Sequence, residues 1–219
     1  MSELQTKIDL LGNELTACGE KCAGICRDQS KGIMPRSLFL ERPDANGRGC
    51  IVIGINPATS LPPERKAYLK YGITYKGVNE YRREKENITY FKRVRLVIGE
   101  LNLPGPILWS NLAKCENTKG RKGLPPVLTI RRCVGRFLHR ELEIAPPDWP
   151  ILTLGRDAYS ALIYLAPQRA VIGIPHPTGS RQDFPKMFTG KHLRKAIANR
   201  AAQALSSSEA GVVWLGRKP

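Results

Sequence analysis

The chain has 219 residues, which is enough for one domain with a substantial core. Its 35 Lys and Arg residues outnumber 19 Asp and Glu residues, so the net charge is +16 and the pI is near 9.9. No apolar stretch approaches the roughly 20 residues of a membrane-spanning helix, and the N-terminus lacks the layout of a signal peptide. We therefore expect a monomer in the cytoplasm, associated with the nucleoid and bound to nucleic acid rather than to a membrane; the alternative is a basic surface that is merely solvated.

The N-terminal third begins with a helical pattern and continues into a loop. An amphipathic helix is predicted over residues 3–17 from the spacing of Leu4, Ile8, Leu11 and Leu15. Residues 28–49 are rich in Gly, Pro, Arg and Asp, so we expect a loop there with one short strand at 37–40. Four short apolar runs without alternation predict strands that are covered on both faces, at 51–55, 107–112, 151–154 and 170–174.

Helical patterns separate and follow these strands, at 89–101, 129–142, 156–165 and 191–205. This alternation predicts an α/β fold, a three-layer αβα domain with a central four-stranded parallel sheet. Residues 62–87 form the one long insertion, which we expect to be irregular and to offer tyrosines among cations for stacking on bases. The whole chain is predicted to be one domain, with an N-terminal helix and cysteine cluster over 1–27 and a C-terminal extension over 206–219.

Polar residues follow three of the predicted strands. The sequence GINPA occupies 54–58, WSNLAKC occupies 109–115 and HPTGS occupies 176–180. Because the carboxyl ends of parallel strands lie along one edge of a sheet, side chains from these segments can face one crevice.

Five of the six cysteines form a second pattern. Cys18, Cys22 and Cys26 recur every four residues, which on a helix would place them on one face, whereas Cys115 and Cys133 lie far downstream beside basic loops. In a chain expected in the cytoplasm, this favours metal binding or burial over a disulfide framework. Cys50 begins a predicted strand, and we interpret it as core packing.

Together, the three strand-exit segments resemble the motifs of the uracil-DNA glycosylase superfamily, in order and in setting, over about residues 18–190. GINPA is similar to the first motif of the mismatch-specific and single-strand-selective branches, whereas Asn-x-x-Lys-Cys with a later Cys is similar to the iron–sulfur branches. The resemblance implies a monofunctional DNA repair glycosylase that flips out uracil, or a related deaminated or damaged base, and hydrolyses its N-glycosidic bond to leave an abasic site. A lyase step needs an amine nucleophile at the sugar carbon, and the motifs provide none.

The resemblance places catalysis on Asn56 and His176. Base excision creates an oxocarbenium-like sugar and a pyrimidine anion, so the site must supply water and stabilise negative charge. The amide of Asn56 does not accept a proton near neutral pH and can only position the water. A neutral His176 would donate a hydrogen bond to O2 of the departing base.

Base recognition is expected mainly from Asn111, whose amide offers a donor to O4 and an acceptor to N3–H and therefore rejects cytosine. Ala58 stands where the strict uracil branch has a bulky Tyr, so we expect 5-substituted or damaged uracils to be tolerated. Tyr75, or Tyr71 as the alternative, is expected to stack on the flipped base. The rest of the first motif is expected to line the base site, at Gly54, Ile55, Pro57 and Ala58.

DNA contacts are expected from residues in the second and third motifs and just beyond the third, namely Lys114, Thr178, Gly179, Ser180 and Arg181. Arg181 is expected to act as a wedge that fills the space left by the extruded nucleotide. The alternative is that this loop only holds His176 in place.

The resemblance also implies a structural [4Fe–4S] cluster, ligated by four of the five thiolates of Cys18, Cys22, Cys26, Cys115 and Cys133. Relatives separate the upstream pair by two residues and this chain by three, so the sequence leaves open which two of the upstream three bind. A zinc ion in the same thiolates and five merely buried thiols are the alternatives. The chemistry itself needs no cofactor. For the whole chain, the alternative function is a catalytically weak nucleic-acid-binding module that retains the glycosylase fold.

Overall fold

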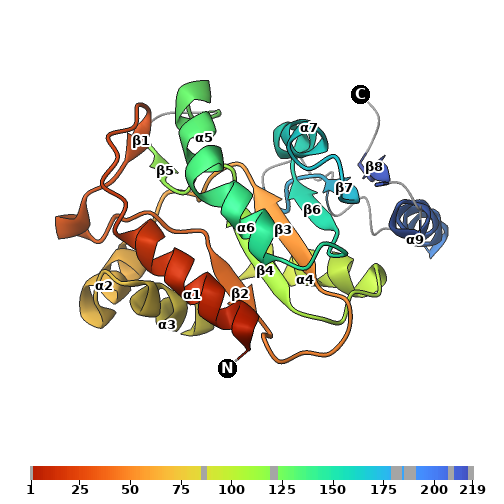
Figure 1. Cartoon of the computed structure of the whole chain (residues 1–219), viewed down its shortest axis with the longest axis horizontal. Helices are drawn as coiled ribbons and strands as arrows, with labels where there is room; N and C mark the ends of the chain where they lie inside the picture. Colours follow the sequence, from red (N-terminus) through yellow and green to blue (C-terminus); the bar gives the residue numbers. More distant parts are fainter. Residues whose placement is uncertain are drawn as a thin grey trace.

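The computed structural model describes residues 2–84, 88–118, 123–178, 184, 191–206 and 210–216. Its centre is one sheet of six strands, in the order β2 (Phe39–Glu41), β4 (Ile107–Asn111), β3 (Cys50–Gly54), β6 (Ile151–Leu154), β7 (Val171–Ile174) and β8 (Val212–Trp214) (Figure 1). β2 runs antiparallel to β4, and all other neighbouring strands are parallel. The predicted α/β class with a mostly parallel sheet is therefore confirmed.

The prediction of four strands is wrong, because two short strands extend the edges of the sheet. The four predicted strands are β3, β4, β6 and β7, and each is almost wholly buried. β2 and β8 have three residues each and are only partly buried. An edge strand has neighbours on one side only, so it does not need the continuous apolar run that identified the central strands.

Helices cover both faces of the sheet, because successive residues of a strand point to opposite sides. Ile51 and Ile53 of β3 share one hydrophobic cluster with α1 (Glu3–Thr16), with α7 (Arg156–Leu165) and with the helical run over 127–144. Cys50 and Val52 share the other cluster with α4 (Thr89–Glu100) and α9 (Lys191–Ser206). The run over 127–144 consists of α5 (Val127–Cys133), a π-helical segment (Val134–Leu138) and α6 (His139–Ile144).

Residues 62–84, predicted to be irregular, form two helices instead, α2 (Pro62–Tyr71) and α3 (Tyr75–Glu84). Pro62 and Pro63 open α2, where a missing backbone N–H has no helical partner to lose. The apolar side chains of α3 recur every three residues and face inward, at Tyr75, Val78 and Tyr81. These few apolar residues are enough to bury one face of the helix. In the sequence, the many polar residues between them concealed this helical pattern.

The connections between strands reverse direction at β3. The chain leaves β3 for β4 on one side and then crosses back to β6 on the other side. Such a reversal opens a crevice at the carboxyl ends of the strands. A separate two-stranded sheet, β1 (Ile25–Cys26) with β5 (Glu116–Asn117), follows the end of β4 and borders this region.

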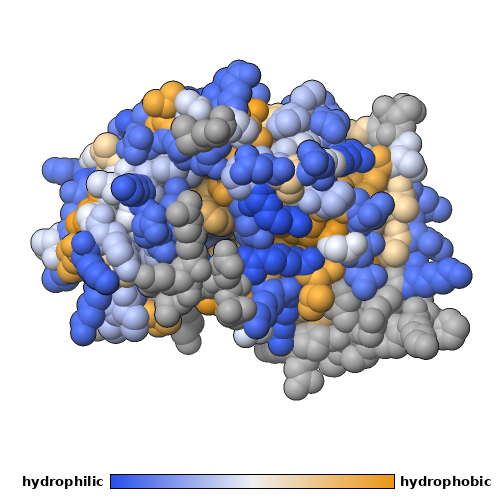
Figure 2. Space-filling model, turned by 90° about the horizontal axis from the view of Figure 1, so that it is seen from below, coloured by the Kyte–Doolittle hydropathy of each residue, from blue (hydrophilic) through white to orange (hydrophobic). Residues whose placement is uncertain are grey.

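The surface is largely polar. Figure 2 shows a face on which hydrophilic residues predominate and hydrophobic residues form separate patches. Within the described part of the chain, no helix combines the length and the apolar character needed to span a bilayer.

A buried ion pair joins the end of β4 to α6. The side chains of Lys114 and Glu141 are 1% and 0% exposed, and Nζ of Lys114 lies 2.7 Å from Oε1 of Glu141. The same ammonium donates to the carbonyl oxygen of Asn111 at 2.7 Å and to the hydroxyl of Ser110 at 2.6 Å. The charge is thus fully surrounded by acceptors, as burial requires.

Replacing Glu141 with Gln is expected to lower the free energy of unfolding by about 3–5 kcal/mol, because the Lys114 ammonium would remain buried without its counter-charge. Urea unfolding followed by circular dichroism measures this change. Glu14→Gln is the control, since Glu14 pairs with Arg140 at the surface and its loss should leave stability almost unchanged. Equal losses in the two variants would show that the buried pair has no special weight.

Candidate functional site

One cavity of about 600 Å³ receives residues from all three strand-exit segments. Its wall includes Asn56, Pro57 and Ala58 after β3, Asn111 at the end of β4, and His176 and Thr178 after β7. The cavity lies at the carboxyl edge of the sheet, where the reversal at β3 opens the crevice. The structure therefore brings the predicted trio of Asn56, Asn111 and His176 to one place.

Gly54 leaves room for the amide of Asn111. A methyl group on Gly54 would collide with Oδ1 of Asn111 and would lie 3.7 Å from the hydroxyl of Tyr90. The backbone of Gly54 does not have a positive φ, so this position favours glycine for its close approach rather than for its backbone conformation. The carbonyl groups of Gly54 and Ile55 accept the N–H groups of Leu112 and Ala113 at 2.9 and 2.8 Å, which continues the ladder beyond the strands. Gly54 and Ile55 thus hold the strand ends beside the cavity but do not line it, in contrast to the prediction that they line the base site.

The loop that carries Asn56 is anchored by two buried side chains. Nη2 of Arg36 donates to the carbonyl oxygen of Ala58 at 2.5 Å and to Glu116 at 3.1 Å. The carboxylate of Glu116 also accepts the backbone N–H of Ser60 at 2.5 Å. Within this loop, the amide of Asn56 donates to the carbonyl oxygen of Pro57 at 2.9 Å, which leaves its Oδ1 as an acceptor for water.

The imidazole of His176 is oriented by its own loop. Nδ1 accepts the backbone N–H of Thr178 at 3.3 Å, so a neutral ring carries its proton on Nε2. The ring is solvent-accessible at the rim, yet the surrounding protein desolvates it enough to lower the pKa of His176 below its ordinary value of 6.5. Arg93 of α4 donates to the carbonyl oxygen of Pro177 at 2.5 Å and holds this loop. At neutral pH the site therefore offers Nε2–H as a donor.

The aromatic wall of the cavity comes from residues that the sequence patterns did not identify. Tyr90, Phe91 and Trp109 line it, with ring centroids of Phe91 and Trp109 4.8 Å apart and those of Tyr90 and His176 5.7 Å apart. Because α4 leads into the parallel strand β4, its first turn must lie near the carboxyl edge of the sheet. From this placement, the sequence could have indicated that Tyr90 and Phe91 lie near the site.

Tyr75 was the wrong residue for the stacking role. It is 4% exposed and lies in the hydrophobic core against Gly12 of α1, where an added methyl group would collide with its ring. Neither Tyr75 nor Tyr71 lines the cavity. Tyr68 and Tyr81 do line it, but they pack edge to face with ring centroids 5.4 Å apart and are nearly buried.

The predicted DNA contacts have different outcomes. Lys114 is 1% exposed and bound to Glu141, so the prediction that it contacts DNA is wrong. Its ammonium is bound instead by Glu141, by the hydroxyl of Ser110 and by the carbonyl oxygen of Asn111. Thr178 is exposed and lines the cavity. Gly179, Ser180 and Arg181 lie outside the described residues.

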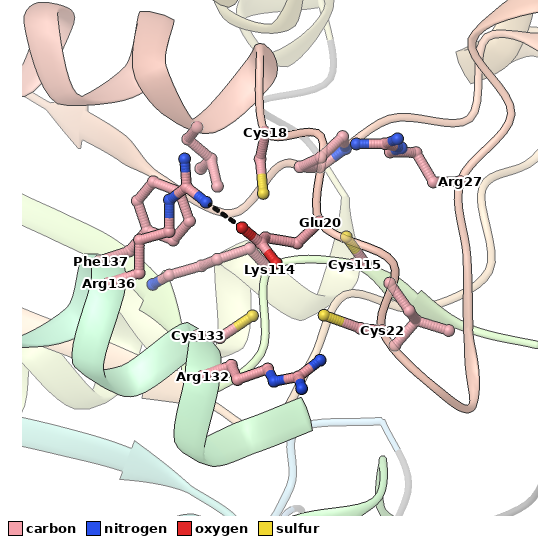
Figure 3. A pocket seen from close by; sticks show the side chains of 13 residues that line it. Cys18, Glu20, Cys22, Arg27, Lys114, Cys115, Arg132, Cys133, Arg136 and Phe137 are labelled. Atoms are coloured by element: carbon pink, nitrogen blue, oxygen red, sulfur yellow. Dashed lines mark hydrogen bonds and ion pairs between the residues drawn. The ribbon is translucent and has the colours of Figure 1, made fainter. Parts of the chain in front are cut away.

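A second cavity of about 320 Å³ gathers Cys18, Cys22, Cys115 and Cys133. Figure 3 shows their sulfur atoms directed into one shared space, from the segment after α1, from the residue that precedes β5 and from the end of α5. Cys26 lies in β1 and does not line this cavity. The structure thus separates Cys18 and Cys22 from Cys26. Because α1 ends at Thr16, the three cysteines do not share a helix face, in contrast to the spacing argument from the sequence.

The cysteine cavity is held together by contacts between distant segments. Glu20 pairs with Arg136 at 2.7 Å (Figure 3). The hydroxyl of Thr129 donates to the carbonyl oxygen of Ala23 at 2.8 Å. Burial raises the pKa of Cys115 to about 12, so a metal would have to displace the thiol proton. Among the residues that the structure describes, no three His, Cys, Asp or Glu side chains are close enough for one metal ion.

Comparisons of the chain with protein-family models, with curated proteins and with solved structures returned no match.

Replacing Gly54 with Ala is expected to displace the amide of Asn111 without unfolding the protein, because the new methyl group meets the movable end of a side chain. The side-chain amide signals of Asn111 should shift in NMR spectra, while the free energy of unfolding changes by about 1 kcal/mol or less. Gly99→Ala in α4 is the matched control, because nothing lies within 4 Å of the methyl group it adds. Unchanged Asn111 signals in the Gly54 variant would contradict the close approach.

Proposed function

We propose that the protein is a monofunctional DNA glycosylase that extrudes uracil, or a related deaminated or damaged base, and hydrolyses its N-glycosidic bond. The observation that carries this proposal is the convergence of Asn56, Asn111 and His176 on one cavity from three separate strand exits. A module that only bound nucleic acid would need no such combination of two amides and an imidazole. The resemblance of the three motifs to the uracil-DNA glycosylase superfamily supports the same reaction.

Asn111 would recognise the base through its amide, donating to O4 and accepting N3–H. Cytosine presents an amino group and an unprotonated N3 on that edge, which reverses the pattern. The lack of a side chain at Gly54 favours one position of this amide, because the amide lies directly over the glycine. The small side chain of Ala58 leaves the neighbouring wall open, which favours bases with a substituent at the 5-position.

His176 would stabilise the leaving base, because Nε2–H can donate to O2 while Thr178 holds Nδ1. A positioned donor of this kind contributes roughly 3–4 kcal/mol to the transition state. Asn56 would hold the attacking water through Oδ1, without removing a proton from it. The aromatic rings of Tyr90 and Phe91 line the same cavity and are the candidates for packing against the flipped base.

DNA is the expected polymer because of the charge of the chain. A net charge of +16 suits the phosphate backbone, and cations are spread along the sequence rather than confined to a tail. Thr178 is exposed and lines the cavity beside His176.

We further propose that Cys18, Cys22, Cys115 and Cys133 hold a [4Fe–4S] cluster. Four thiols around one cavity form the donor set of such a cluster. A zinc ion bound by the same four thiolates is the alternative. The bound cluster would act as a structural cross-link that ties the segment after α1 to β4 and α5, with no part in base excision.

Replacing His176 with Ala is expected to lower the single-turnover excision rate on a uracil-containing oligonucleotide on the order of 10²- to 10³-fold, through loss of the donor to O2. His139→Ala is the control, because His139 is exposed on α6 and does not line the cavity. Because desolvation lowers the pKa of His176 below its ordinary value of 6.5, the imidazole is mostly neutral at pH 7, so its contribution should level off toward higher pH and change as the pH falls through the lowered pKa.

The assay uses single- and double-stranded oligonucleotides with uracil, 5-substituted uracil, hypoxanthine, xanthine or mismatched thymine, and alkali cleaves the abasic sites. Tight DNA binding without cleavage of any substrate would favour the binding module instead.

Replacing Cys22 with Ser is expected to remove bound iron and the broad absorbance near about 400 nm that a [4Fe–4S] cluster gives. Cys26→Ser is the matched control, because Cys26 lies outside the cavity, and it should retain both signals. Iron analysis and absorbance of protein purified without oxygen measure the two variants. Equal loss in both, or stoichiometric zinc in the wild type, would contradict the assignment.

A further inference from the structure

The cavity lined by Asn56, Asn111 and His176 is called the base cavity, and the part of its wall formed by Arg36 and Arg82 is called its arm. We propose that this arm is an anion subsite that receives a carboxylate or phosphate group of the substrate. The proposal rests on the proposed function of the cavity as the base site. Both arginines line the same cavity as Asn56, Asn111 and His176, and neither belongs to the three motifs. Each keeps a buried guanidinium nitrogen, Nη1, without a hydrogen-bond partner.

Arg36 is built into the wall of the cavity. Its side chain is 5% exposed, Nη2 binds Ala58 and Glu116, and Nε lies 3.2 Å from a carboxylate oxygen of Glu64. These contacts fix the plane of the guanidinium and leave Nη1 unused. Because a buried donor without a partner is unfavourable, a ligand acceptor would complete this group.

Arg82 of α3 carries the less compensated charge. Among the described residues, no carboxylate forms an ion pair with it, and its guanidinium lies over the ring of Phe39, 5.1 Å from the centroid. Burial lowers the pKa of Arg82, which reflects the cost of holding the cation among protein atoms. An oxyanion would provide the missing counter-charge and a planar acceptor for the guanidinium fork.

The nearby charges leave a positive excess. Glu116 is shared by Arg36 and Arg65, at 3.1 and 3.6 Å, and Glu64 pairs with Arg36. Among the residues that the structure describes, three guanidinium groups therefore face two carboxylates, and Arg82 is the one without a pair. One negative charge on a ligand would balance this arm.

The wall between the catalytic residues and this arm is open enough for a substituent. Ala58 contributes only a methyl side chain, and its carbonyl oxygen is the acceptor that Arg36 binds. A cavity of about 600 Å³ is within the range of about 300–1,000 Å³ that holds ligands larger than a pyrimidine. The anion can thus be a carboxylate on the base or the phosphate of the flipped nucleotide.

The test is calorimetric titration of the full chain with uracil, 5-carboxyuracil, deoxyuridine and deoxyuridine 5′-monophosphate. At least one anionic probe is expected to bind about tenfold or more tightly than its neutral partner. An advantage of 5-carboxyuracil over uracil identifies a base carboxylate, and an advantage of the monophosphate over deoxyuridine identifies a phosphate. No advantage for either, or no measurable binding of either anionic probe, overturns the proposal.

Arg82→Gln is expected to remove that advantage and to leave the affinity for the neutral probe unchanged. Arg156→Gln is the matched control, since Arg156 also lies over an aromatic ring, that of Trp214 at 5.5 Å, but outside the cavity. If Arg82→Gln does not fold, Arg82→Lys keeps the charge without the fork and should retain only part of the advantage. An advantage that survives in both Arg82 variants overturns the subsite.

The outcomes separate this proposal from the proposed function. Uracil excision without preference for an anionic probe would leave the glycosylase and reject the subsite. Preference for an anionic probe that depends on Arg82, without excision of any base, would leave the subsite and reject the glycosylase.

Discussion

The buried ammonium of Lys114 is the interaction on which both cavities depend. Its Nζ binds Glu141 of α6 and also the carbonyl oxygen of Asn111, so it holds the strand exit that carries the Asn111 amide. The same residue lines the cysteine cavity and directly precedes Cys115. A charge this deeply buried tolerates little displacement, because every shift would leave part of it without an acceptor. Lys114 therefore links the wall of one cavity to the wall of the other.

The segment from the end of β4 to β5 serves both cavities with neighbouring residues. Cys115 faces the cysteine cavity, whereas Glu116 turns the other way and anchors Arg36 and Ser60 in the wall of the base cavity. The cysteine cavity and the loop after β3 are thus joined through one short stretch of backbone. The proposed anion subsite lies on the same support, because Arg36 is held by Glu116.

The candidate site was predictable where its residues lie at strand exits. Asn56 and His176 follow buried apolar runs, and Asn111 ends one, so parallel pairing alone brings them to one edge. Tyr75 was misassigned because its direction depends on how α3 packs against α1, where Gly12 leaves space for the ring. No local pattern contains that information.

The sequence by itself determined the order of the four central strands, the three strand-exit motifs and the excess of positive charge, because these depend on neighbouring residues and composition. The tertiary structure decided which thiols share a cavity, selecting Cys18 and Cys22 over Cys26. It also decided that Lys114 is buried and that Arg36 and Arg82 reach the base cavity. These outcomes depend on contacts between segments far apart in the chain, and such contacts arise only when the helical layers pack against the sheet.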